Sequence, residues 1–170
     1  MSVFNISNTK QKPVPTDIVD QHLSRMVKKE GADLISTKGI SAYRRGRAAS
    51  IVQLLNQLPG PWYKKVKVRD IPGMEKGLIR YHSLVASLMP VLEDPWLNSR
   101  SNEDIAYLLS NYWVALRNMM PQAFKNPADF RVQSTVGVYS LHMLFPSVIN
   151  LCIAVGDYSV STMESVLQYT

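Results

Sequence analysis

The side chains most able to do chemistry in this sequence are basic and aromatic, and they gather in two short stretches. The residues are Arg44, Arg45 and Arg47 in the first stretch, and Trp62, Lys64, Lys65, Lys67 and Arg69 in the second. Lysine and arginine neutralise phosphate groups, and exposed aromatic rings stack on bases. We therefore expect these residues to contact nucleic acid. The alternative is an ordinary solvated face, with Trp62 buried in the core.

The distribution of charge supports a polyanion surface in the first half of the chain. Residues 1–80 contain 15 of the 19 lysines and arginines but 6 of the 13 acidic residues, a balance of +9. Residues 81–170 contain the remaining 4 basic and 7 acidic residues, a balance of −3. The entire positive excess of the chain therefore lies before residue 81, where it would attract a phosphate backbone.

Signals for catalysis are weak by comparison. His22, His82 and His142 fall on three separate expected helices, without the spacing of a metal site. The glycines form no phosphate-binding loop, and no nucleophile motif is present. We expect no metal, no cofactor and no self-contained enzyme. Convergence of His82 or His142 with an acidic residue in a pocket would instead favour a small enzyme.

The helix expected over residues 101–120 has the clearest pattern in the chain. Its apolar residues recur at steps of three and one, as on a helix face packed into a core: Ile105, Leu108, Leu109, Tyr112, Trp113, Leu116, Met119 and Met120. Ser101 is positioned to cap its N-terminus, with Asp104 at the acid position of a capping box. Pro121 should end it, because residues before proline avoid helical geometry.

Weaker patterns predict the other elements. Helical spacing predicts helices over residues 16–30, 41–58 and 76–89, and Ser161 with Glu164 predicts a last one to residue 169. Gly46 weakens the second of these helices, which could begin after it. Alternation of apolar and basic residues predicts a short strand over residues 62–69. Residues 32–41 and 93–100 are expected to be connecting loops.

Residues 132–156 form a run of 25 residues without a charge. A run of this length raises the question of a membrane span. However, polar residues and a proline interrupt it, and its flank has a single basic residue, Arg131, instead of a basic cluster. We expect a buried core helix rather than a span, with an interface helix between two chains as the remaining alternative. Cys152, inside this run, is expected to be a buried and unreactive thiol.

The expected fold is mainly α: a helical, bundle-like single domain with a short N-terminal arm and one short strand. The arm covers residues 1–15, a basic helical half covers 16–100, and core helices cover 101–170. The first residues carry no basic start followed by an apolar segment, so no signal peptide is expected and a cytoplasmic location is the default.

Four segments resemble, in order along the chain, proteins with a DGQHR domain, the family that includes the DndB-type proteins associated with DNA phosphorothioation. Residues 4–15 (FNISNTKQKPVP) are similar to its "F…IN…Q-K-x-V" segment, and residues 55–63 to its "LN…SPW" junction. Residues 109–124 (LSNYWVA…P…F) resemble its "NYF-A-I…P…W" helix, and residues 135–145 its late "T-G…L" helix.

The resemblance has one important departure. The chain contains no Asp-Gly-Gln-His-Arg sequence, so none of the residues of that motif is carried over. The resemblance implies that this chain is the helical C-terminal part of such a domain, without its motif-bearing half. Asn8 and Gln11 match family positions near the motif; their alternative role is to form a turn.

The function expected from these observations is that of a non-catalytic helical portion of a DGQHR/DndB-like protein. It would be linked to DNA modification, phage defence or its regulation, and would contact DNA through its basic first half. The alternative is a helical protein-interaction or oligomerisation module without a nucleic-acid role. In that case the uncharged run would form an interface core, and the partner would be a second copy or an upstream domain.

Overall fold

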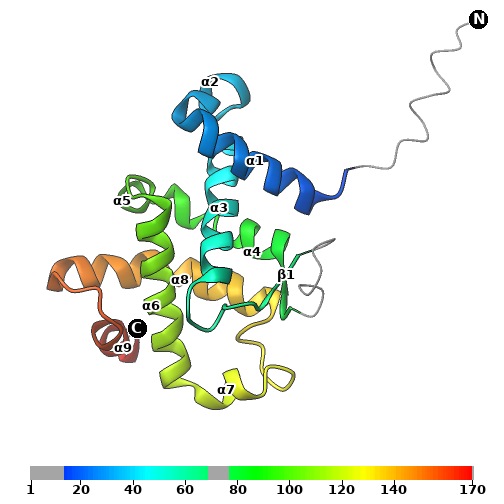
Figure 1. Ribbon diagram of the computed structural model, residues 1–170. Coiled ribbons are helices and arrows are strands. Elements are labelled where there is room, and N and C mark those ends of the chain that lie inside the picture. Colours follow the sequence, from blue (N-terminus) through cyan, green and yellow to red (C-terminus); the bar gives the residue numbers. More distant parts are fainter. Residues whose placement is uncertain (1–13, 69–76, 170) are drawn as a thin grey trace, which may run out of the picture.

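The protein is mainly α-helical, as its sequence predicts. The computed structural model describes residues 14–68 and 77–169 (Figure 1). The elements, in chain order, are α1 (Thr16–Glu30), η3 (Gly31–Asp33), α2 (Leu34–Lys38), α3 (Ile40–Gln57), β1 (Val66–Lys67), β2 (Ile79–Arg80), α4 (Tyr81–Ser87), η4 (Val91–Glu93), α5 (Pro95–Asn98), α6 (Asn102–Met119), α7 (Pro121–Lys125), α8 (Thr135–Val155) and α9 (Val160–Gln168).

Helix α6 contributes many residues to the core and confirms the strongest sequence prediction, except at its end, where Met119 is 37% exposed and Met120 lies after the last helical residue. Ser101 caps it: the Ser101 hydroxyl accepts a hydrogen bond from the backbone N–H of Asp104 at 3.0 Å. Its apolar face packs against α3 and α9, and α6 runs beside α3 in Figure 1. Tyr112 and Trp113 on this face are fully buried. Pro121 ends α6 as expected and is also the first residue of α7, a position that suits proline.

Helices α1 and α3 cross at Gly46, which corrects the expectation that α3 could begin after this glycine. Helix α3 runs through Gly46 without a break. A Cβ atom at residue 46 would lie 2.5 Å from Cγ2 of Val27 and 2.6 Å from the carbonyl oxygen of Leu23, both on α1. Glycine is therefore needed here because the two helices approach closely.

The expected strand over residues 62–69 is shorter in the structure, and the expected helix over residues 76–89 begins later. Residues 61–65 form turns, and β1 contains Val66 and Lys67 alone. It pairs in parallel with β2, with Val66 opposite Ile79 and Lys67 opposite Arg80. Because the backbone at Ile79 and Arg80 is extended to make this pairing, helical geometry starts at Tyr81.

Two segments expected to be loops contain short helices. Helix α2 lies within residues 32–41, and α5 lies within residues 93–100. Helix α5 has a local cause that the sequence does show: the Asp94 carboxylate accepts from the N–H of Leu97 at 2.9 Å, and Pro95 occupies the first helical position.

Helix α8 begins after Ser134, whose hydroxyl accepts from the N–H of Gly137, and ends at Gly156 in a left-handed conformation (φ 76°). The expectation of a buried core helix holds for one face alone. That face packs against α4, η4 and α9, while apolar side chains on the opposite face are exposed. Among the described residues, α8 is the one helix long and apolar enough, by length and composition, to cross a membrane.

Helix α9 is capped two residues earlier than the sequence suggested. Ser159, not Ser161, is the N-cap, and its hydroxyl accepts from the N–H of Thr162 at 3.3 Å. Asp157 accepts hydrogen bonds from the Ser159 N–H and hydroxyl and from the Thr162 hydroxyl. These contacts hold the pKa of the Asp157 carboxyl below its usual value. The acidic residue that stabilises the start of α9 is therefore Asp157, which precedes the helix.

Candidate functional site

Four exposed residues make a compact basic and aromatic surface, which we call the basic loop (Tyr63, Lys64, Lys65 and Lys67). Tyr63 is 44% exposed, and all three lysines are exposed. The Nζ atom of Lys64 lies 5.0 Å from the centre of the Tyr63 ring, close enough for a cation–π contact. Its three lysines are the exposed members of the predicted nucleic-acid surface in the described part of the chain, whereas Arg44 and Arg45 are partly buried.

Buried side chains and hydrogen bonds to Asn56 hold the backbone of the basic loop in place. Val66 and Val68 are buried and alternate with Lys65 and Lys67, so the two lysines face outward. The backbone N–H of Lys64 donates to the carbonyl oxygen of Asn56 at 3.0 Å, and that of Val66 donates to the Asn56 side chain at 3.1 Å. Lys64 has a positive φ of 53°, which closes the turn that presents the lysines.

Trp62 does not belong to this surface, contrary to the sequence prediction. Its ring is 1% exposed and meets Trp113 edge to face, with 4.8 Å between the ring centres. Within the described part of the chain, the indole Nε1 has no hydrogen-bond partner. A ring buried this deeply cannot stack on a base, so Trp62 has the alternative role that we considered, that of a core residue.

Arg47 is likewise part of the internal structure. The residue is 5% exposed, and its guanidinium joins α3 to the start of α6. Nε donates to Oδ1 of Asn102 at 2.9 Å, Nη1 to the carbonyl oxygen of Asn98 at 2.7 Å, and Nη2 to the carbonyl oxygen of Arg100 at 2.5 Å. Burial lowers the pKa of the Arg47 guanidinium from its usual value. Because four of its five N–H donors are used internally and the residue is buried, Arg47 is not available to a phosphate.

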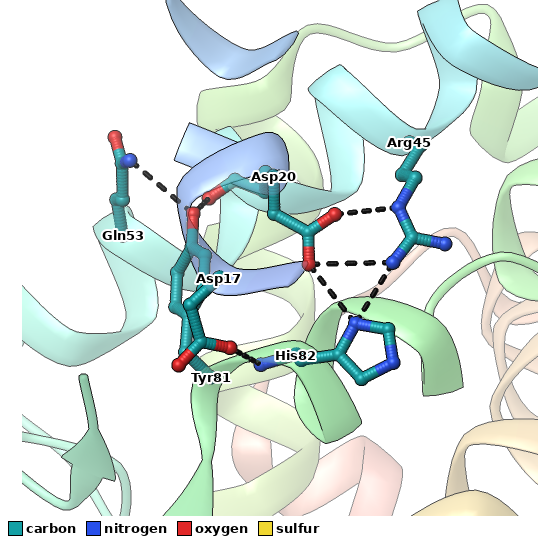
Figure 2. Close-up of polar contacts among 7 residues, drawn as sticks. Asp17, Asp20, Arg45, Gln53, Tyr81 and His82 are labelled. Atoms are coloured by element: carbon teal, nitrogen blue, oxygen red, sulfur yellow. Dashed lines mark hydrogen bonds and ion pairs between the residues drawn. The ribbon is translucent and has the colours of Figure 1, made fainter. Parts of the chain in front are cut away.

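Arg45 belongs to a polar cluster that Figure 2 shows in close-up, in which Arg45, Asp20 and His82 each contact the other two. Asp20 lies on α1 and is fully buried. Its carboxylate accepts from Arg45 Nε at 2.5 Å and from Arg45 Nη2 at 3.4 Å. Asp17, one turn earlier, accepts from the backbone N–H of His82 at 3.2 Å. The cluster thus connects α1, α3 and α4, and Arg45 is committed to it.

The His82 ring makes two contacts that cannot exist together as hydrogen bonds. Its Nδ1 lies 2.8 Å from Arg45 Nη2 and 3.1 Å from Asp20 Oδ2. A guanidinium can only donate, so the Arg45 contact requires a bare Nδ1. The Asp20 contact requires a proton on the same nitrogen. The presence or absence of a proton on Nδ1, which the tautomer of the ring sets, therefore decides which neighbour His82 binds.

This His–Asp convergence lies outside the lining of the neighbouring cavity. A cavity of about 190 Å³ lies near the cluster, and its described lining residues are Gln21, Val52, Gln53, Asn56, Gln57, Val66, Val68 and Tyr81. His82 and Asp20 are not among them. The hydroxyl of Tyr81 donates to the carbonyl oxygen of Ala49, and burial raises its pKa. A small enzyme would be favoured if His82 or His142 met an acidic residue in a pocket. Among the described residues, His82 meets Asp20, but neither of them lines this cavity.

His142 is inaccessible as well. It is fully buried between Trp113, whose Nε1 donates to Nε2 of His142 at 3.0 Å, and Ser87, whose Oγ lies 2.9 Å from Nδ1. Burial lowers the pKa of His142 to about 3. The ring is a satisfied core residue, as is Cys152, whose side chain is also buried. No group of three potential metal ligands occurs among the described residues.

The remaining predicted residues are Arg44, Arg69, Asn8 and Gln11. Arg44 is partly buried and makes a long ion pair of 3.9 Å with Glu93, an exposed partner. Contacts of this kind are weak. Arg69 and the two positions of the family resemblance, Asn8 and Gln11, lie outside the described residues. The three lysines of the basic loop are thus the exposed residues of the predicted site in the described part of the chain.

Comparison of the chain with protein-family models, with curated proteins and with solved structures finds no match.

Proposed function

We propose that this protein is a helical, nucleic-acid-binding module that contacts phosphates through the basic loop. The observation that carries the proposal is the grouping of three exposed lysines and an exposed tyrosine on one anchored turn and the strand β1 that follows it. The lysines neutralise phosphates, and the Tyr63 ring offers a face on which a base can stack. The setting we propose is the one implied by the DGQHR/DndB-like resemblance: DNA modification, phage defence or its regulation.

The proposed surface is narrower than the one expected from the sequence. Arg45 binds Asp20, and Arg47 binds the start of α6. They add to the positive electrostatic potential of the protein but do not contact phosphates directly. A module with three phosphate contacts binds weakly and without sequence preference. Each contact contributes about 0.9 to the slope of log K against log salt on duplex DNA, so we expect a slope of about −3.

Fluorescence anisotropy with labelled single-stranded and duplex DNA, over a series of salt concentrations, tests the proposal. The triple variant Lys64→Gln, Lys65→Gln, Lys67→Gln should lose most of the binding and nearly all of the salt slope. The matched control changes three exposed lysines on α1 and α2 in the same way, Lys28, Lys29 and Lys38, which alters net charge equally. Equal losses in both triple variants, or no binding at low salt, would contradict the proposal.

Tyr63→Ala separates stacking from charge. Stacking of one base on an aromatic ring is worth about 1–3 kcal/mol. Tyr63→Ala should therefore weaken binding to single strands, whose bases are accessible, more than binding to duplex. Tyr107→Ala is the control, because Tyr107 is also exposed but lies on α6.

We propose self-association as a second function, which one observation favours independently. Helix α8 carries no charge and has an exposed apolar face, including Val136 (70% exposed), Met143 (64%) and Val155 (67%). Apolar surface of this kind marks interfaces. Light scattering over a concentration series tests this function, and a monomer at every concentration would rule it out.

A further inference from the structure

The exposed face of α8 has a regular pattern, which we call the outward stripe (Val136, Ser140, Met143, Ser147, Asn150 and Ala154). All six residues are exposed. They follow one another at alternating steps of four and three, the spacing of a coiled-coil seam. At about 100° per residue, the six side chains fall within an arc of about 80° on the helix surface. The face opposite this arc packs into the core, with Val138, Phe145 and Cys152 fully buried.

The composition of the outward stripe suits a helical partner. It has no charged residue, and small side chains recur at every seventh position: Ser140, Ser147 and Ala154. Small residues allow the backbones of two helices to approach closely, and the larger residues between them fill the space that remains. Tyr139 and Leu151, exposed by 37% and 49%, flank the stripe on its two sides.

The stripe is complementary to itself when two copies run in opposite directions. With the two-fold axis passing near residue 145, Val136 of one copy faces Ala154 of the other, and Met143 faces Ser147. Each large side chain then lies opposite a small one. The same register places Ser140 opposite Asn150, so that the polar residues can satisfy each other by hydrogen bonding. A parallel pair would instead place Ser, Ser and Ala layers opposite themselves and leave gaps.

We propose that α8 pairs antiparallel with α8 of a second copy of this chain, in the register that joins Val136 to Ala154. This inference rests on the second proposed function and specifies its geometry. The stripe and its flanking residues, Thr135, Tyr139, Leu151 and Val155, provide ten residues from each copy. Stable interfaces use roughly 20–30 residues a side, so the pair is a weak, concentration-dependent dimer.

A membrane is a less suitable occupant than a second copy. The inner face of α8 is fastened to the core by polar contacts: Trp113 and Ser87 bind His142, and the Tyr112 hydroxyl donates to the carbonyl oxygen of Leu141 at 2.9 Å. A spanning helix would have to break these contacts and leave buried polar groups without partners.

Sedimentation equilibrium of the full chain measures the association. Met143→Asp places a charge at the centre of the seam and should abolish the dimer, raising the dissociation constant at least 100-fold. Tyr107→Asp is the matched control, because Tyr107 on α6 is 62% exposed, close to the 64% of Met143, and should leave association unchanged. Both substitutions are at exposed positions, and circular dichroism checks that both variants are folded.

Disulfide trapping then tests orientation and register. In the antiparallel register, a mixture of the Val136→Cys and Ala154→Cys variants forms a cross-linked dimer, because the two positions face each other. Each variant alone does not, since its two copies of the new cysteine lie about 27 Å apart along the helices. The unmodified chain controls for Cys152, which is buried.

The outcomes separate the inference from the function on which it rests. A dimer that cross-links with either variant alone is parallel, and a dimer that cross-links in no combination uses another surface. Either result overturns the antiparallel pairing and leaves self-association standing. A chain that remains monomeric overturns both. Co-sedimentation with vesicles of neutral phospholipid that is lost in Met143→Asp would show that lipid, rather than a second copy, covers the stripe.

Discussion

The indole Nε1 of Trp113 donates a hydrogen bond to Nε2 of His142 across 3.0 Å, and this contact fixes the tautomer of a fully buried histidine. Because Trp113 can only donate, Nε2 must accept, and the ring proton lies on Nδ1. Nδ1 then donates to the Ser87 hydroxyl at 2.9 Å, and that hydroxyl donates to the carbonyl oxygen of Leu84 at 2.8 Å. The chain of contacts joins α6, α8 and α4, and it requires a neutral imidazole.

Acid should therefore destabilise the protein through His142. The pKa of His142 is lowered by burial from 6.5 to about 3 in the folded protein, so the unfolded chain binds the proton more tightly. The stabilisation is fully present above pH 6.5 and is lost as pH falls from 6.5 towards 3. The loss is about 1.4 kcal/mol per pH unit once the unfolded histidine is protonated. Urea denaturation at several pH values measures it.

His142→Gln is the variant that isolates this contribution. A glutamine amide can accept from Trp113 and donate to Ser87, but it does not titrate. We expect lower stability at neutral pH and a shallower loss of stability between pH 6.5 and 4. An unchanged acid dependence in His142→Gln would show that other groups cause it.

Gly46→Ala should destabilise the protein by about 1–3 kcal/mol, although alanine is the better helix former by about 1 kcal/mol. The new Cβ would meet the Leu23 carbonyl oxygen at 2.6 Å, and backbone there cannot move without shifting α1. Gly60→Ala is the control, since its Cβ would meet only the Ser110 hydroxyl, at 3.2 Å. Thermal denaturation of the two variants gives the comparison, and a stabilised Gly46→Ala would contradict the close crossing.

Arg47→Lys tests whether this arginine is structural or is available to a ligand. Lysine keeps the charge but cannot reach Asn98, Arg100 and Asn102 together from a single ammonium group. We expect a loss of about 2–4 kcal/mol in unfolding free energy. Arg25→Lys, at an exposed position on α1, should be neutral. If the Arg47→Lys variant were fully stable but bound DNA more weakly, Arg47 would belong to the nucleic-acid surface.

A double-mutant cycle on Asp20 and Arg45 measures the strength of their ion pair. Removing one partner, by Asp20→Asn or Arg45→Met, leaves the other without its charge partner in a site where Asp20 is fully buried. We expect each single variant to lose about 2–4 kcal/mol and the coupling energy to be about 2 kcal/mol or more. A coupling below about 0.5 kcal/mol would mean that Arg45 is free to bind elsewhere.

The sequence by itself determined the helical class and the central helix of this protein. Both follow from local rules: the apolar stripe of α6 needs only a period of 3.6 residues, and Ser101 caps within three residues of itself. The sequence also marked the uncharged run that became α8. These features depend on near neighbours along the chain, which a sequence displays directly.

Tertiary structure alone decided which basic residues remain available. Arg45 and Lys65 look alike in sequence, but Arg45 meets Asp20, 25 positions earlier, whereas Lys65 projects from a turn anchored by Asn56. It likewise placed Trp62 against Trp113 and exposed one face of α8. The physical reason is that the partners of a charged side chain or an aromatic ring can be distant along the chain. Whether such partners meet depends on how helices such as α1 and α3 pack.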